Sequence, residues 1–239
     1  MSFTKIDLHT HTVASGHAYC TIKEMAKTAS EKGLSMLGIS DHGPAMKGSI
    51  TDVYFYNLRI IPRELYGVEL LIGAELNIVD YDGTTDVEER GKRNLDYAIA
   101  SLHTLCIKPG TREENTRAIV KAMENPYVNI IGHPDDKRYP LDYEQVVRAA
   151  KENRVLLELN SASLDPNGIR RDCRDLDAEM LKCCEKFDAP VIFGSDAHFD
   201  DRIAFFDRQI SLVEEVGFPK ELVMNDKPEL LRSYLNKWK

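Results

Sequence analysis

Several features that would direct an interpretation are missing from this sequence. No apolar run approaches the ~20 residues needed to cross a bilayer, and the first residues contain no apolar core of a signal peptide. There is no internal repeat and no segment rich in proline, glycine or serine. These absences argue against a membrane protein and a repeat array. They predict one cytoplasmic α/β domain over residues 1–239, which is long enough to bury a substantial core.

Cysteine and positive charge are also scarce. The five cysteines are odd in number and form no C-x-x-C pair, which favours reduced thiols over a disulfide framework. The chain has 31 Lys and Arg residues against 39 Asp and Glu, for a net charge of −8. Because nucleic-acid binders usually present a basic face, we expect no nucleic-acid partner. An anionic substrate would then need a local source of positive charge, which metal ions would supply.

Short apolar runs alternate along the chain with longer segments of helical period. The predicted strands are Thr4–His9, Met36–Ser40, Leu70–Leu76, Tyr97–Leu102, Val128–Gly132, Val155–Leu159 and Pro190–Gly194. The predicted helices are Ile22–Glu31, Leu58–Tyr66, Arg112–Asn125, Tyr143–Glu152, Cys173–Phe187, Arg202–Val216 and Pro228–Lys237. This alternation favours a closed or nearly closed parallel barrel, with an open doubly wound sheet as the competitor. No glycine-rich phosphate loop follows a strand, so a nucleotide-binding version of the open sheet has no support.

The seven histidines have an uneven distribution. Each lies at, or just beyond, the C-terminal end of a predicted strand, where barrels of this class carry their active sites. A single histidine there is more often an ordinary core or loop residue, but seven of seven indicate a metal site. With two carboxylates at the same rim, the candidate ligands are His9, His11, His17, His42, Glu75, His103, His133, Asp196 and His198.

Nine ligands are too many for one ion, since zinc usually takes about four. Three divalent ions that share a bridging carboxylate would use all nine and leave positions for substrate. An all-nitrogen-and-oxygen set suits zinc, manganese or iron, and disfavours calcium because imidazole is a poor calcium ligand.

Six ordered motifs, "DLHTH", "SDHG", "GAELN", "SLH", "GHP" and "GSDAH", resemble the PHP (polymerase and histidinol phosphatase) metal-dependent phosphoesterases. "HTVASGHAY", "ISDHGPAM", "NLRIIPR" and "LELNSAS" are similar to the small YcdX-type zinc phosphatases within that family. The resemblance implies a distorted (β/α)7 TIM-like barrel with a trinuclear site, most simply of zinc. One ion would be held by His9, His11, Glu75 and Asp196, the second by Glu75, His103 and His133, and the third by His17, His42 and His198.

The expected activity is a phosphatase that hydrolyses small phosphomonoesters by attack of a metal-bound hydroxide, with Glu75, Asp196 and His198 as catalytic residues. Three alternatives stay open: a histidinol-phosphate phosphatase, a PHP-type nuclease, and a non-catalytic metal-binding protein. The complete ligand set disfavours the last, and the acidic composition disfavours the nuclease. A small phosphorylated substrate is the expected partner; the chain can be a homo-oligomer, and no membrane partner is expected.

Basic and polar residues near the predicted ligands could contact the substrate, although most such loop charges are simply solvated. The candidates are Arg59, Lys137, Arg138, Asn160, Arg170 and Arg171. Asp7 shares strand parity with His9, so it either orients a ligand imidazole or caps a neighbouring loop. The same two roles are possible for Asp41, which precedes His42 in the sequence.

Overall fold

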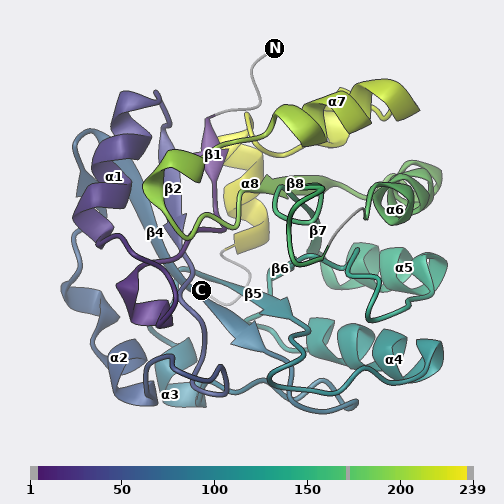
Figure 1. The fold of residues 1–239 in the computed structure, drawn as a ribbon, viewed down its shortest axis with the longest axis horizontal. Coiled ribbons are helices and arrows are strands. Elements are labelled where there is room, and N and C mark those ends of the chain that lie inside the picture. The colour runs from purple at the N-terminus through teal and green to yellow at the C-terminus, as the bar shows by residue number, and fades with distance from the viewer. Residues whose placement is uncertain (1–4, 171–172, 236–239) are drawn as a thin grey trace.

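The backbone forms an α/β barrel that is almost closed (Figure 1). The computed structural model describes residues 5–170 and 173–235. Within those ranges seven parallel strands follow chain order around the sheet: β1 (Ile6–Asp7), β2 (Met36–Ile39), β4 (Val68–Asn77), β5 (Tyr97–Ser101), β6 (Ile130–Ile131), β7 (Leu156–Asn160) and β8 (Val191–Gly194). The segments after β1 and β8 meet, because the backbone N–H of His11 donates to the oxygen of Ala197 at 2.9 Å. The predicted TIM-like barrel is confirmed.

Helices cover the outside of this barrel. The described residues contain α1 (Ile22–Glu31), α2 (Asp52–Tyr56), α3 (Glu89–Lys92), α4 (Arg112–Met123), α5 (Tyr143–Asn153), α6 (Arg174–Phe187), α7 (Asp207–Val216) and α8 (Pro228–Leu235). α4, α5 and α6 pack side by side on one flank (Figure 1). Two helices begin with capping boxes, Thr21 with Glu24 in α1 and Thr111 with Glu114 in α4. These local signals explain why both helices start where the sequence predicts.

The predicted helix Leu58–Tyr66 is wrong. The segment instead contains a short 3-10 turn, Leu58–Ile60, followed by strand β3 (Glu64–Leu65), which pairs antiparallel with β4. Pro62 offers no N–H to a helix and disfavours helical geometry at the residue before it. Tyr66 and Gly67 both have positive φ, 54° and 76°, as a two-residue hairpin turn requires.

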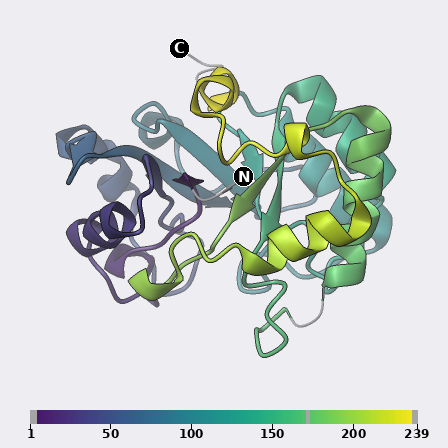
Figure 2. The same ribbon diagram turned by 90° about the horizontal axis from the view of Figure 1, so that it is seen from above.

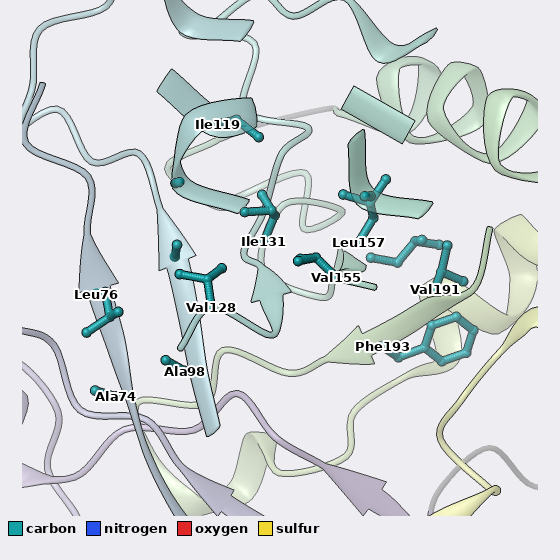
Figure 3. Packing of buried hydrophobic residues seen from close by; sticks show 14 of the residues in the cluster. Ala74, Leu76, Ala98, Ile119, Val128, Ile131, Val155, Leu157, Val191 and Phe193 are labelled. Atoms are coloured by element: carbon teal, nitrogen blue, oxygen red, sulfur yellow. The ribbon is translucent and has the colours of Figure 1, made fainter. Parts of the chain in front are cut away.

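Side chains alternate along each strand between the barrel interior and the layer under the helices. Ala98, Leu157 and Phe193 point outward into the layer that also holds Ile119 of α4 (Figure 3). Inward-facing Tyr97 and Ile99 pack with residues of α8, which closes the N-terminal end of the barrel (Figure 2). A Cβ on Gly38 would lie 2.2 Å from the Tyr97 hydroxyl, so only glycine leaves room for that ring. This packed lower half leaves the C-terminal ends of the strands as the place for a site.

Candidate metal centre

All seven histidines lie at the C-terminal rim of the barrel, as the sequence predicts. Glu75 stands near the end of β4, among inward-facing residues, while its neighbours Ala74 and Leu76 face the outer layer. The side chain of Glu75 is buried. The Glu75 carboxylate is therefore the central group around which the rim side chains gather.

Five imidazoles surround the two oxygens of Glu75. Oε2 lies 2.8 Å from Nδ1 of His42, 3.4 Å from Nε2 of His9 and 3.5 Å from Nε2 of His11. Oε1 lies 3.0 Å from Nε2 of His133 and 3.3 Å from Nε2 of His103. One carboxylate thus reaches two groups of ring nitrogens, as a bridging ligand must.

Asp196 forms a second centre on the opposite side of His9 and His11. Its Oδ1 lies 3.3 Å from Nε2 of His11, 3.6 Å from Nε2 of His9 and 3.5 Å from Nδ1 of His198. The Nε2 atoms of His198 and His17 are 3.0 Å apart. The rings of His17 and His42 stack with centroids 5.0 Å apart. All nine predicted ligands therefore belong to one continuous cluster.

Several polar atoms at the centre of this cluster are buried and make no well-aligned hydrogen bond within the described residues, although some of them lie close together: Nε2 of His9, Nε2 of His11, Nδ1 of His42 and Oε2 of Glu75. Leaving such atoms unsatisfied costs ~1–3 kcal/mol each. Three overlapping groups in the described residues have ligand atoms close enough to share an ion: His9–His11–Asp196, His42–Glu75–His103 and His11–His42–His198. The residues present fit divalent ions, which would satisfy these atoms together.

Three of the imidazoles also contact a polar side chain through their Nδ1 atoms. Nδ1 of His9 lies 2.6 Å from Oε1 of Glu158, Nδ1 of His103 lies 2.8 Å from Oδ1 of Asn77, and Nδ1 of His11 lies 3.0 Å from Oγ of Ser15. Such contacts set the tautomer and the ring orientation. The sequence pattern alone did not indicate that these residues belong to the site. The signal for Glu158 was a lone carboxylate inside the apolar strand "VLLELN".

Asp7 and Asp41 act on the backbone and on neighbouring hydroxyls. Asp7 accepts the N–H groups of Ala204, Ser195 and His9, so it anchors loops and does not touch an imidazole. Asp41 accepts from the hydroxyl of Ser15 at 2.7 Å, and Ser15 contacts His11. Of the two roles considered for Asp7, the structure therefore supports the capping of neighbouring loops and not the orientation of a ligand imidazole.

The backbone at two of these positions has an unusual conformation. His133 and Asp196 follow strands β6 and β8 with φ of 31° and 56°, in the left-handed region that side chains with a Cβ rarely adopt. Such conformations cost about 1–3 kcal/mol and persist where the surroundings hold them. Here the N–H of His133 donates to Glu158 at 2.7 Å and that of Asp196 to the oxygen of His9 at 2.8 Å. These bonds hold the strained backbone.

Charge balance keeps the site ready to bind a cation. Burial raises the pKa of Glu75 and of Asp196, but the histidines around Glu75 and the His9 and Arg170 charges beside Asp196 bring both well below their ordinary values. Burial lowers the pKa of His11, His17 and His103, which keeps these imidazoles neutral. Burial also opposes protonation of His9, yet Glu158, Glu75 and Asp196 raise its pKa well above the usual value. Ionised carboxylates and mostly neutral imidazoles are the forms that bind metal.

The cluster opens into a cavity of about 930 Å³. His17, His42, His103 and His198 line it together with Arg138 and Arg170. Arg170 contacts Asp196 and donates to Asn160 Oδ1 at 3.1 Å, so two of the predicted substrate residues are coupled. Arg138 pairs with Asp136.

The remaining substrate candidates are elsewhere. Arg59 and Lys137 are exposed and do not line this cavity, and Arg171 lies outside the described residues. Within the described ranges, no helix is long and apolar enough to span a membrane.

Comparisons with known proteins agree with this geometry. A chain from Acetivibrio thermocellus, named a probable phosphatase, is 47% identical over 235 residues, 98% of this chain and 96% of that protein. One from Clostridium novyi with the same designation is 46% identical, covering 96% and 93% of the two chains. The histidinol phosphate phosphatase of Lactococcus lactis, solved with zinc, L-histidinol and phosphate, shares the fold with a TM-score of 0.62 and 19% identity, over 90% of this chain and 95% of that one. The model of the PHP domain matches residues 7–162, and the chain belongs to the PHP family.

Proposed function

We propose that this protein is a metal-dependent phosphatase that hydrolyses small phosphomonoesters at a site for three divalent ions. The observation that carries the proposal is the set of buried, unpartnered ligand atoms around Glu75 at the base of an open cavity. The names of the relatives, which match almost the whole chain, support phosphate esters as substrates.

The contacts support a division of the ligands among three ions. His9, His11, Glu75 and Asp196 would hold the first, because the four imidazole–carboxylate distances among them are 3.3–3.6 Å. Glu75, His103 and His133 would hold the second. His17, His42 and His198 would hold the third, with His42 also reaching Glu75. The donor set fits zinc, with manganese and iron as alternatives.

Bound divalent ions would lower the pKa of water towards about 7 and neutralise the phosphoryl oxygens. The residues of the chain position that chemistry. Glu75, Asp196 and His198 act as the catalytic ligands, and Glu158, Asn77 and Ser15 keep the imidazoles oriented. Arg170, half-buried against Asp196 in the cavity wall, can donate to a phosphoryl oxygen.

A phosphatase screen on metal-analysed protein tests the proposal. The panel should contain phosphomonoesters, a phosphodiester and single-stranded DNA. We expect phosphate release from monoesters and little or none from the diester or DNA. Release of nucleotides from DNA at a rate matching monoester turnover would support the nuclease alternative instead.

Histidinol phosphate belongs in the same panel, because a structural neighbour acts on it. That likeness extends to the fold alone at 19% identity. Growth of a histidine auxotroph that lacks its own phosphatase separates the possibilities: rescue by this chain would identify a histidinol-phosphate phosphatase, and we expect no rescue.

A further inference from the structure

Large apolar side chains that remain exposed are concentrated at the mouth of the cavity. Tyr19, Leu105, Ile169 and Phe199 are 74%, 67%, 89% and 51% exposed. They make up four of the nine large hydrophobic residues that are exposed in the described part of the chain, and all four line this cavity. Apolar surface grouped around one opening marks a binding surface, whereas scattered exposed residues do not.

These residues come from four separate loops at the same end of the barrel. Tyr19 follows β1, Leu105 follows β5, Ile169 follows β7 and Phe199 follows β8. The backbone N–H of Tyr19 donates to the oxygen of His198 at 3.1 Å, which ties the apolar rim to the candidate metal centre. If the phosphate group of a substrate lies at the histidines, the alcohol part of that substrate lies among these apolar side chains.

The carboxylates on the described part of the cavity wall are already paired with arginines. The three carboxylates that line it each face an arginine: Asp165 with Arg208, Asp196 with Arg170 and Asp201 with Arg202. A cationic substrate would therefore find no free carboxylate among the described lining residues, and could bind one only by displacing an arginine. This disfavours substrates with an ammonium group.

Two serine hydroxyls of the wall are also engaged in hydrogen bonds within the protein. The hydroxyl of Ser161 donates to the backbone oxygen of Phe205 at 2.6 Å, and that of Ser195 to the oxygen of His9 at 3.2 Å. A sugar hydroxyl placed against Leu105, Ile169 and Phe199 would lose hydrogen bonds to water and find no polar partner in these side chains, which is costly. An apolar group has no hydrogen bonds to water to lose, and it gains stability by burying its surface against the rim.

We propose that the substrate is the monophosphate ester of an apolar alcohol, with an aryl or branched alkyl body held between Tyr19, Leu105, Ile169 and Phe199. The inference rests on the proposed phosphatase function. The cavity of about 930 Å³ is near the upper end of the ~300–1,000 Å³ typical of small-molecule sites, and exceeds what a phosphate group needs.

Four esters of primary alcohols, which place similar demands on the chemical step, test this preference: 2-phenylethyl phosphate, ethyl phosphate, glucose 6-phosphate and histidinol phosphate. We expect kcat/KM for 2-phenylethyl phosphate to exceed each of the others by about tenfold or more. Equal or faster hydrolysis of glucose 6-phosphate or histidinol phosphate would overturn the inference while leaving the phosphatase function intact.

Variants of the apolar side chains at the cavity mouth test whether these residues cause the preference for 2-phenylethyl phosphate. The double variant Leu105→Ser/Ile169→Ser should lower kcat/KM for 2-phenylethyl phosphate about tenfold and leave ethyl phosphate within about twofold. Ile60→Ser is the matched control, because Ile60 is 70% exposed and lies outside the cavity. The Ile60→Ser variant should leave kcat/KM unchanged for both 2-phenylethyl phosphate and ethyl phosphate. An equal loss for both substrates in the double variant would count against the apolar site.

Binding of 2-phenylethylphosphonate, which cannot be hydrolysed, gives a readout independent of turnover. Calorimetry should show tighter binding than for ethylphosphonate, and the Leu105→Ser/Ile169→Ser variant should abolish the difference. If no phosphate ester is hydrolysed but this difference is present, the phosphatase proposal fails and the apolar site stands. If the two phosphonates bind equally, the apolar site is refuted.

Discussion

Glu158 contacts two of the candidate metal ligands, His9 and His133, on the side away from the centre of the cluster. Its Oε1 lies 2.6 Å from Nδ1 of His9, and its Oε2 accepts the backbone N–H of His133 at 2.7 Å. Asn160 donates to the same Oε2 at 3.0 Å. One buried carboxylate thus orients a ring in one group of ligands and holds the strained backbone of another.

Glu158→Gln should therefore weaken metal binding in a folded protein. The amide cannot offer the anionic acceptor that holds Nδ1 of His9, and loss of such a partner costs about 10–100-fold in metal affinity or activity. Metal titration measures the dissociation constants, and circular dichroism shows whether the variant is folded. An unchanged dissociation constant for every ion would show that Glu158 serves packing alone.

Glu75→Gln should remove metal and phosphatase activity together. Among the described residues, the Glu75 carboxylate is the one group whose two oxygens contact both sets of imidazoles, and a neutral amide cannot bridge two cations. Metal analysis and a phosphatase assay should be run on the same preparation. Full activity in a folded Glu75→Gln variant would rule out the bridging role.

Removal of metal should destabilise the protein. Ions that bind only the folded state add RT ln(1 + [L]/Kd) to its stability, about 4 kcal/mol at a concentration 1,000 times Kd. Chelation should lower Tm, and zinc should restore it. Metal analysis should return about three ions per chain; a single tightly bound ion would refute the three-ion site.

Asp177→Asn should stabilise the protein at alkaline pH. Both carboxylate oxygens of Asp177 are buried, and the side chain of Asp135 lies within hydrogen-bond reach of them. Burial, together with Asp135 and Glu158, raises its pKa well above the usual value. Because the folded state binds the proton more tightly than the unfolded state, this group contributes stability below its unfolded pKa and loses it as pH rises. The asparagine cannot ionise, so the gain in free energy of unfolding should be larger at pH 8 than at pH 4.

Denaturant unfolding of wild type and Asp177→Asn at several pH values measures this difference. A variant that is less stable than wild type at pH 8 would contradict the assignment. Asp80→Asn is a suitable control, because Asp80 is partly solvent-accessible and, although partial burial raises its pKa, the N–H groups of Thr84 and Asp82 donate to it and bring its pKa below the ordinary value. Its effect should have the opposite sign.

The strand pattern and the positions of the histidines were sufficient to predict the barrel and the residues at its rim. Parallel strands place their C-terminal ends together, so residues that follow strands in the sequence must converge in space. The helix predicted after Asn57 is wrong, because Pro62 interrupts the helical period of that segment. The hairpin there depends on pairing with β4, a contact that local sequence does not encode.

The sequence by itself determined which chemical groups are available: seven histidines, Glu75 and Asp196, each following or ending a strand. Only the tertiary structure decided which partners they have. Glu158 faces His9 across 149 positions of sequence, and Asn77 faces His103 across 26. The apolar rim likewise assembles from four loops. Pairings of this kind depend on how the sheet curves and closes, and alternation along a single strand does not specify that geometry.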